Sequence, residues 1–180
     1  MLAIYREENG QYILDCENAV WSTDAIHRVY QQAGIHLNDV DFVIETESSL
    51  LLVEYKNARI SNAVHPEAFQ PESEKKYSIL VRKYYDSLHF LHALGKQRPR
   101  QYVVILEYPN GDYVSRRRIR DRLVSDLPFR LHTVLGVREP VIEEVAVLSL
   151  DEWNDHPDYG KYPFRMESPE HLTGGTRDEV

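Results

Sequence analysis

The sequence predicts an α/β domain with a central mixed β-sheet flanked by helices on both faces and a β-hairpin at its N-terminal end. Two apolar runs, 50–53 and 101–108, have the composition of strands that are buried on both faces of a sheet. Residues 74–94 between them carry apolar side chains at helical spacing. Strands that alternate with helices in this way are typical of α/β domains. With 180 residues, the chain is long enough to form one such domain.

Turn and capping residues place the individual elements. Asn9-Gly10 suits a tight β-turn, and Gly34 and Gly95 are expected to end helices. Ser73 is expected to cap a helix start, and Pro128 is expected to break a helix. In chain order the expected elements are a hairpin over 2–14, a helix over 17–33, a strand hairpin over 39–57, a helix over 74–94, a strand over 101–108, a helix from 115 and a strand over 141–150.

Two segments fall outside these elements. Residues 57–73 are interpreted as a polar loop that is long for a compact domain, and His65 within it as incidental rather than catalytic. The chain from 165 onward has no hydrophobic periodicity and is expected to be disordered. We therefore expect a single domain over 1–164 and a tail over 165–180.

The most informative feature is a pair of apolar strands with charged residues at one end. The first strand begins near Asp41, and the second ends in Glu54-Tyr55-Lys56. Side chains at positions i and i+2 of a strand lie on the same face, so Glu54 and Lys56 share one face of the sheet. Whether Asp41 joins them depends on the length of the turn within 46–49.

A two- or four-residue turn places Asp41 opposite Glu54 or Lys56, and all three side chains then lie on one face. A three- or five-residue turn moves Asp41 to the other face, because a shift of one residue inverts every side chain of a strand. The turn lacks the Asn-Gly dipeptide that would fix its length. We favour convergence of the three residues.

The spacing of Glu54 and Lys56 is not specific by itself. The same Glu-x-Lys pattern occurs at Glu74, where the acid suits the first turn of a helix. Glu54 instead follows the most hydrophobic run of the chain. The simpler interpretation is a salt bridge on a solvated rim, which would stabilise the fold little. The position at the end of a buried strand favours a functional site over that interpretation.

Charge is distributed unevenly along the chain, whose net charge is −8. Residues 1–74 carry a net charge of −9, residues 75–130 of +8 and residues 131–180 of −7. A basic segment between acidic ones is compatible with a face that binds phosphates, and equally with two ordinary solvated helix faces. The overall acidity predicts weak, salt-sensitive contacts with nucleic acid rather than tight sequence reading.

Several function classes are excluded or poorly supported. The single Cys16 excludes an internal disulfide and a cysteine-based zinc site. No apolar run reaches the length of a membrane span, and the N-terminal residues lack the apolar core of a signal peptide. A cytoplasmic protein without a membrane partner is therefore expected. The chain contains no glycine-rich phosphate loop, no nucleophile elbow and no His-Glu-x-x-His motif.

Asp41 and Glu54-Tyr55-Lys56 on neighbouring strands, with a helix before them and a basic helix after them, resemble the PD-(D/E)xK nuclease superfamily, which has the restriction-endonuclease-like fold. The resemblance covers roughly residues 17–150. Members are Mg²⁺-dependent phosphodiesterases that usually act on DNA, so the resemblance implies a nuclease that uses Mg²⁺, with Mn²⁺ as a substitute ion. The helix after the lysine lacks the Gln-x-x-x-Tyr signature of the exonuclease branch.

The resemblance assigns roles position by position. Asp41, Glu54 and Lys56 would form the catalytic set, in which Asp41 and Glu54 hold the metal. The backbone carbonyl of Tyr55 would complete the metal shell. Many members add a glutamate from the first helix, and Glu17 is the nearest match in this chain. Asp24 is the alternative candidate for this helix-borne acid. Glu17 is also interpreted, alternatively, as an acid in the first turn of a helix that the helix dipole favours.

Residue chemistry gives these roles a mechanism. Carboxylate oxygens are hard ligands and select Mg²⁺ or Mn²⁺ over Zn²⁺. The ion would polarise a phosphoryl oxygen and activate a water for in-line attack. Lys56 would orient or deprotonate that water, or offset charge in the transition state. DNA is expected as the partner rather than RNA, and its phosphates are expected to contact four basic residues: Lys83, Arg116, Arg117 and Arg120.

Two other interpretations stay open. The first is a catalytically inactive nuclease-fold protein that serves as a nucleic-acid- or protein-binding subunit. The net acidity favours it, and so does the lack of a separate DNA-reading module. The second is an unrelated α/β domain whose Asp41, Glu54 and Lys56 form only a surface ion network. A homodimer or a complex with another protein is compatible with each interpretation.

Overall fold

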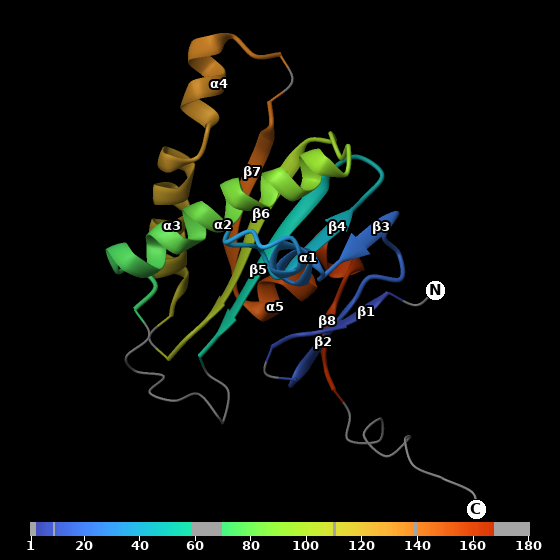
Figure 1. Cartoon of the computed structure of the whole chain (residues 1–180). Coiled ribbons are helices and arrows are strands. Elements are labelled where there is room, and N and C mark those ends of the chain that lie inside the picture. The colour runs from blue at the N-terminus through green and yellow to red at the C-terminus, as the bar shows by residue number, and fades with distance from the viewer. Residues whose placement is uncertain (1–2, 9, 59–69, 110, 139, 168–180) are drawn as a thin grey trace, which may run out of the picture.

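The computed structural model describes residues 3–8, 10–58, 70–109, 111–138 and 140–167 (Figure 1). A five-stranded sheet has the order β3-β4-β5-β6-β7, and a three-stranded sheet has the order β1-β2-β8. The strands are β1 (Ile4–Arg6), β2 (Tyr12–Asp15), β3 (Trp21–Thr23), β4 (Phe42–Glu45), β5 (Leu50–Asn57), β6 (Arg100–Glu107), β7 (Ile142–Leu148) and β8 (Phe164–Met166). The helices are α1 (Ile26–Gln32), α2 (Glu74–Ala93), α3 (Tyr113–Asp126), α4 (Phe129–Leu135), α5 (Leu150–Asp155) and the 3₁₀ helix η2 (Tyr159–Lys161).

The five-stranded sheet is mixed. β3, β4 and β5 form an antiparallel meander, whereas β5, β6 and β7 run parallel to one another. The parallel strands are joined through α2 and through α3 with α4, because each parallel connection has to return along the sheet. β5 and β6 are buried along nearly their whole length, as expected for strands that are covered on both faces.

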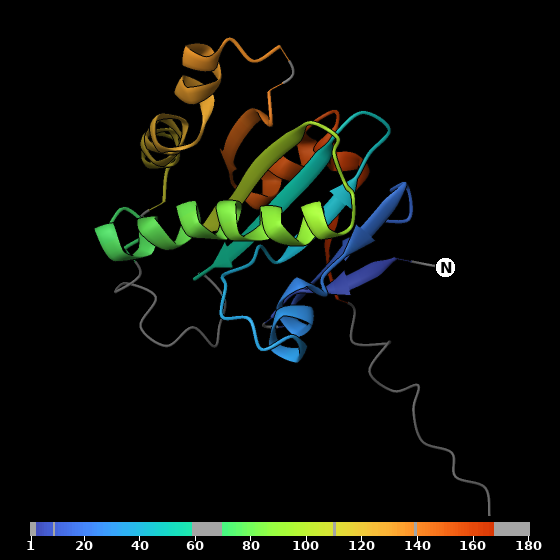
Figure 2. The same ribbon diagram turned by 45° about the horizontal axis from the view of Figure 1, so that its top comes forward.

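Two hydrophobic cores lie on the two faces of this sheet. On one face α1, α2 and α3 pack against alternate strand residues such as Val43 and Leu52. On the other face α5 and the three-stranded sheet cover the intervening residues, such as Ile44 and Val53. Figure 2 shows α2 lying across the strands on the first face, with α5 behind them. The predicted fold class, a mixed sheet with helices on both faces, is therefore confirmed.

The N-terminal hairpin is also confirmed. β1 and β2 pair antiparallel, and β8 joins the other side of β2. Gly10 turns the chain between the strands with φ 69°, a conformation that glycine adopts without strain. The hairpin covers the second face of the central sheet, where Phe42 contacts the rings of Tyr5 and Phe164.

The helix expected over 17–33 is wrong in its first half. Residues 21–23 form β3 instead, with Trp21 opposite Glu45 of β4. The helix starts only at Ile26, after the Thr23 hydroxyl has accepted the backbone N–H of Ala25 at 3.0 Å. The edge of β4 offers hydrogen bonds to an extended segment, so strand pairing outweighs the helical spacing of the apolar residues.

The fold continues beyond the boundary expected at residue 164. The sequence analysis did not predict α5, η2 or β8. Trp153 of α5 is fully buried, and its indole N–H donates to the Tyr162 carbonyl at 2.8 Å. The backbone N–H of Glu167 donates to the Gln11 carbonyl at 2.9 Å. Residues 165 and 166, expected in the tail, therefore belong to β8, and Glu167 directly after them still bonds to the segment before β2; residues 168–180 lie outside the described residues.

The two long helices agree closely with the sequence. α2 begins directly after Ser73 and is followed by Gly95 with φ 68°. Ser73 occupies the expected capping position, but its side chain makes no cap hydrogen bond. Pro128 separates α3 from α4, as expected.

The loop expected over 57–73 falls mainly on residues 59–69, which lie outside the described residues, as does His65. Its two ends are described: β5 runs to Asn57, and α2 begins at Glu74. In the part of the chain that the structure describes, no helix has the length and apolarity needed to cross a membrane.

Candidate functional site

The β4–β5 hairpin brings Asp41, Glu54 and Lys56 to one face of the sheet. Its register pairs Phe42 with Val53, so the turn over 46–49 contains four residues and Asp41 comes opposite Glu54. This is one of the two turn lengths that gather the three side chains. The predicted convergence is confirmed, and the shared face is the one covered by α1, α2 and α3.

Hydrogen bonds within the turn fix its length. The Thr46 hydroxyl accepts the backbone N–H groups of Ser48 and Ser49 at 3.2 and 2.9 Å. The Thr46 N–H in turn donates to the Ser49 carbonyl at 2.9 Å. A threonine side chain that satisfies backbone donors two and three residues later stabilises this turn in place of an Asn-Gly dipeptide.

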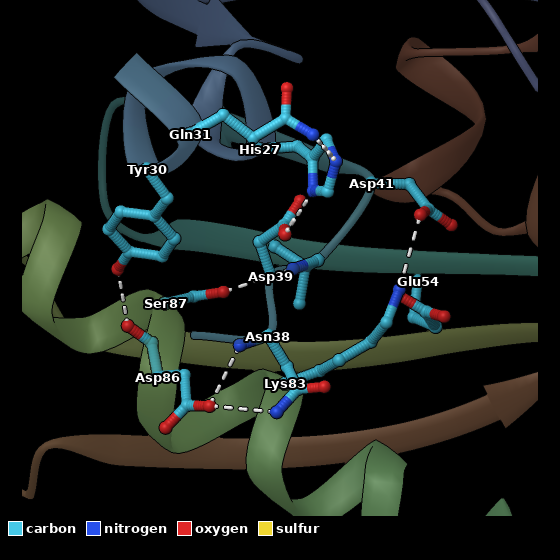
Figure 3. A network of polar contacts seen from close by, with 11 residues as sticks. His27, Tyr30, Gln31, Asn38, Asp39, Asp41, Glu54, Lys83, Asp86 and Ser87 are labelled. Carbon is cyan, nitrogen blue, oxygen red and sulfur yellow. Dashed lines mark hydrogen bonds and ion pairs between the residues drawn. The ribbon is translucent and has the colours of Figure 1, made fainter. Parts of the chain in front are cut away.

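A fourth charged residue completes the group. Lys83 reaches from α2 to both acids, with its Nζ 2.8 Å from Glu54 Oε2 and 3.4 Å from Asp41 Oδ1 (Figure 3). Lys56 Nζ lies 3.1 Å from Glu54 Oε1 and 3.9 Å from Asp41 Oδ2. We refer to Asp41, Glu54, Lys56 and Lys83 as the acid–lysine cluster. Two carboxylates and two ammonium groups leave it with no net formal charge.

Burial differs sharply within the acid–lysine cluster. The Glu54 side chain is fully buried, whereas those of Asp41 and Lys56 are 30% and 34% exposed. Burial raises the pKa of Glu54 to about 7, the Asp41 carboxylate adds to this shift, and the two lysines oppose it. Burial lowers the pKa of Lys56, but the carboxylates of Glu54 and Asp41 outweigh burial and raise it above its ordinary value. Lys56 is therefore an ammonium at neutral pH.

One carboxylate oxygen of the acid–lysine cluster is left without a hydrogen bond. Glu54 Oε1 is buried and has no partner of suitable geometry, although Lys56 Nζ forms an ion pair with it. Buried carboxylate oxygens are normally hydrogen-bonded, and an unsatisfied one is costly. The ion pair with Lys56 Nζ, at 3.1 Å, is thus what compensates this oxygen in the ion-free protein.

The backbone of Tyr55 faces the same position. Its N–H donates to Asp41 Oδ2 at 2.8 Å. The N–H and C=O of a strand residue lie on the same side of the strand, so the Tyr55 carbonyl also faces Asp41. β4 pairs with β5 only as far as Val53, which leaves this side of Tyr55 to the Asp41 side chain.

α2 positions the loop that carries Asp41 as well as supplying Lys83. Asp86 Oδ2 accepts the Asn38 backbone N–H at 2.9 Å, and the buried Ser87 hydroxyl accepts the Val40 N–H at 3.0 Å (Figure 3). Residues three and four positions after Lys83 lie on the same helix face as Lys83. One helix face therefore fixes the loop that carries Asp41 and also supplies Lys83.

The sequence analysis missed the roles of Asp86 and Ser87. Their signal is present in the sequence, because the polar Ser87 lies among the buried apolar residues of α2 and Asp86 beside it is half-buried. Buried polar groups of this kind normally satisfy backbone donors or acceptors elsewhere in the fold. Which backbone they satisfy depends on the packing of the loop against the helix.

α1 holds the other side of the same loop. His27 Nδ1 lies 3.0 Å from Asp39 Oδ1, and Gln31 Nε2 lies 2.8 Å from His27 Nε2. The Tyr30 hydroxyl donates to the Asp86 carbonyl and accepts the backbone N–H of Phe90. Contacts from two helices thus hold the segment before Asp41 in place.

The structure does not bring Glu17 to the acid–lysine cluster. Glu17 precedes β3, and Trp21 at the start of β3 lies opposite Glu45, at the end of β4 distant from Asp41. The expected assignment depended on a helix that does not form there. The alternative, Asp24, is exposed between β3 and α1.

The donors present fit a hard cation held by two acids. Among the described residues, no group of three or more His, Cys, Asp or Glu side chains is placed to hold a metal ion. Asp41 and Glu54 supply two carboxylates, one of which has an unsatisfied buried oxygen. With the Tyr55 carbonyl they make an all-oxygen set, which suits Mg²⁺ or Mn²⁺ rather than Zn²⁺.

The three arginines expected to bind phosphates differ in availability. Arg116 donates two hydrogen bonds to Glu152 at 3.0 and 3.1 Å and is 11% exposed. Arg120 donates to the Val145 carbonyl at 3.2 Å but is about half exposed. Arg117 is 65% exposed, with its Nε 4.0 Å from Asp121. Arg117 and Arg120 line a hollow of about 420 Å³ beside β7, whose lining does not include the acid–lysine cluster.

Comparisons with models of known protein families, with curated proteins and with solved structures found no match. What can be inferred about function therefore comes from the geometry and chemistry of the acid–lysine cluster.

Proposed function

We propose that the chain is a metal-dependent phosphodiesterase of the PD-(D/E)xK type that acts on DNA. The observation that carries the proposal is the convergence of Asp41, Glu54 and Lys56 at the end of two buried strands. Structural ion pairs seldom leave a fully buried carboxylate oxygen without a hydrogen bond, as Glu54 does here. Groups with strongly perturbed pKa values are also concentrated at functional sites.

Asp41 and Glu54 would hold Mg²⁺ or Mn²⁺ together with the Tyr55 carbonyl. When bound, the ion would supply Lewis-acid polarisation of a phosphoryl oxygen and a water of lowered pKa. The protein contributes the orientation of these ligands, because the Tyr55 N–H and the loop contacts from α2 fix Asp41. Glu54 is fixed by its place within β5, which pairs with β6 along its whole length.

Lys56 would act on the phosphoryl group as a cation. Its raised pKa keeps the side chain protonated at neutral pH, so it can donate a hydrogen bond or offset charge in the transition state. Its side chain is 34% exposed, which leaves it accessible to a substrate. Proton abstraction from water by Lys56 would first require loss of its own proton.

Contacts with the DNA backbone would come from exposed cations on α3. Arg117 and Arg120 are sufficiently exposed to reach phosphates, whereas Arg116 is held by Glu152. Phosphate contacts position a nucleic acid without reading its sequence. We also propose a cytoplasmic location, which a single buried thiol fits.

A cleavage assay tests the proposal. Plasmid DNA, single-stranded DNA and RNA are incubated with the full chain in Mg²⁺, in Mn²⁺ and in EDTA. We expect cleavage of DNA that requires the divalent ion, and a loss of about 10²–10⁴-fold in Lys56→Ala. Lys161→Ala, which removes an exposed lysine beside Asp158, is the matched control and should cleave normally. Equal cleavage by Lys56→Ala and wild type would reject the assignment, provided that circular dichroism shows both variants folded.

A second function has one specific observation in its favour. The acid–lysine cluster carries no net formal charge, as in a self-sufficient ion network, and such a network fits an inactive binding subunit on a nuclease-like fold. DNA binding measured by fluorescence anisotropy, without cleavage in any ion, would support this subunit. A pure ion network would bind neither DNA nor Mn²⁺, and calorimetry with Mn²⁺ on wild type and Asp41→Ala detects that case.

A further inference from the structure

Lys83 occupies the position between the two acids. Its ammonium is 2.8 Å from Glu54 Oε2 and 3.4 Å from Asp41 Oδ1, so it bridges one oxygen of each carboxylate. It is the more buried of the two lysines in the cluster: its side chain is 15% exposed, against 34% for Lys56. It comes from a helix rather than from the hairpin that carries the other three residues.

The bridge has an electrostatic consequence for the acids. Two carboxylates this close repel each other, and Glu54 has no water to screen it because it is fully buried. Both lysines offset this charge, and Lys83 is the nearer of the two to each acid: Lys56 Nζ is 3.1 Å from Glu54 and 3.9 Å from Asp41. Lys83 is also the more buried lysine, so its contact with the acids is the less screened by solvent.

The same bridge obstructs a shared divalent ion. An ion shared through Asp41 Oδ1 and Glu54 Oε2 would have to approach within about 2.0–2.6 Å of both oxygens, and the Lys83 ammonium now lies between them. A unit charge and a divalent charge at this separation repel strongly. Lysine has a flexible four-carbon stem, so its ammonium can withdraw while α2 stays in place.

We propose that Lys83 is a tethered counter-ion that holds Asp41 and Glu54 together until a divalent ion displaces it. This inference rests on the proposed function, since it assumes that the two acids bind the ion. Lys83 weakens ion binding and stabilises the ion-free protein. Displaced from the acids, its ammonium lies beside the site, where a substrate phosphate would attract it.

Mn²⁺ titrations test the inference without any measurement of cleavage. Isothermal calorimetry and the Mn²⁺ paramagnetic resonance signal are recorded for wild type, Lys83→Met and Lys83→Arg at one fixed pH. Lys83→Met should bind Mn²⁺ at least about tenfold more tightly than wild type, because a unit charge is removed beside both ligands. Lys83→Arg keeps the charge and should stay within about threefold of wild type.

Two further variants locate the effect. Arg82→Met removes the same charge from the neighbouring, exposed position of α2 and should leave the affinity for Mn²⁺ within about twofold. Asp41→Asn combined with Lys83→Met should lose the tighter binding. In EDTA, Lys83→Met should melt at a lower temperature than wild type, and Mn²⁺ should raise its melting temperature by more than that of wild type.

The outcomes separate this inference from the proposed function. Mn²⁺ binding by wild type with equal or weaker binding by Lys83→Met overturns the role of Lys83 and leaves the metal site standing. Absence of Mn²⁺ binding in every variant overturns both. Binding that is detectable only in Lys83→Met supports the inference in its strongest form.

Discussion

The hairpin formed by β4 and β5 carries a buried glutamate at each end, and the two glutamates are partnered differently. Glu45, opposite Leu50, pairs one oxygen with Lys96 and the other with Arg98 Nε at 3.0 Å. Lys96 also lies over the Trp21 ring, 4.4 Å from its centroid. Glu54, near the other end, shares its two cations, Lys56 and Lys83, with Asp41. Its buried Oε1 forms an ion pair with Lys56 but no hydrogen bond of good geometry.

The difference separates a structural ion pair from a candidate site. Both glutamates have a cation on each oxygen, but in the described ion pairs Lys96 and Arg98 contact Glu45 alone, and they tie the hairpin to the segment between α2 and β6. Asp41 and Glu54 instead share Lys56 and Lys83, and the two acids repel each other, which adds to the raised pKa of Glu54. Burial therefore does not distinguish the two glutamates, whereas the second acid beside Glu54 does.

The largest expected contrast is in activity. Glu54→Gln should reduce Mg²⁺-dependent DNA cleavage by at least about 10²-fold, because an amide is a poor ligand for a hard cation. Glu45→Gln makes the same chemical change at the other end of the hairpin and should stay within about threefold of wild type. Initial rates with both variants, below their melting temperatures, make the comparison. Similar losses in the two variants would remove the distinction between the two glutamates.

A smaller contrast is expected in the pH dependence of stability. The pKa of Glu54 is about 7 in the folded protein, against an ordinary value of 4.5. Between pH 4.5 and pH 7 the folded state therefore keeps a proton on Glu54 that the unfolded state releases. Wild type should therefore lose stability as the pH rises from 5 to 8. Relative to wild type, the unfolding free energy of Glu54→Gln should grow by roughly 2–3 kcal/mol over this range. Urea denaturation in EDTA measures it, and a constant difference between the two proteins would contradict the raised pKa.

The smallest expected effect is the loss of the structural pair. Glu45→Ala should lower the free energy of unfolding by about 1–2 kcal/mol at neutral pH. The cost is below that of breaking a fully buried pair, since Lys96 and Arg98 are 23% and 37% exposed and can turn towards water. Glu47→Ala in the exposed part of the turn is the control and should change stability by less than about 0.5 kcal/mol. A loss above about 4 kcal/mol would mean that the pair at Glu45 is buried more completely than its exposure indicates.

Local sequence signals located most of the fold and three of the four residues of the acid–lysine cluster. Continuous apolar runs identified β5 and β6, and the apolar stripe of α2 with Gly95 after it identified the long helix. Strands that form only because a neighbouring strand is present to pair with them were not predicted. Residues 21–23 lie within the expected helix but pair with β4 instead. β8 is only three residues long and is formed by its pairing with β2. The Ser149 and Glu152 capping box of α5 is a local signal that was overlooked.

The sequence by itself determined that Glu54 and Lys56 share a face, because side chains alternate along every strand. It also limited the position of Asp41 to two faces. The tertiary structure decided between those faces through the four-residue turn closed by Thr46. It alone placed Lys83 between the acids, and Asp86 and Ser87 against the loop before Asp41. These contacts join residues more than twenty-five positions apart, and only the packing of α2 across the sheet sets which of them meet.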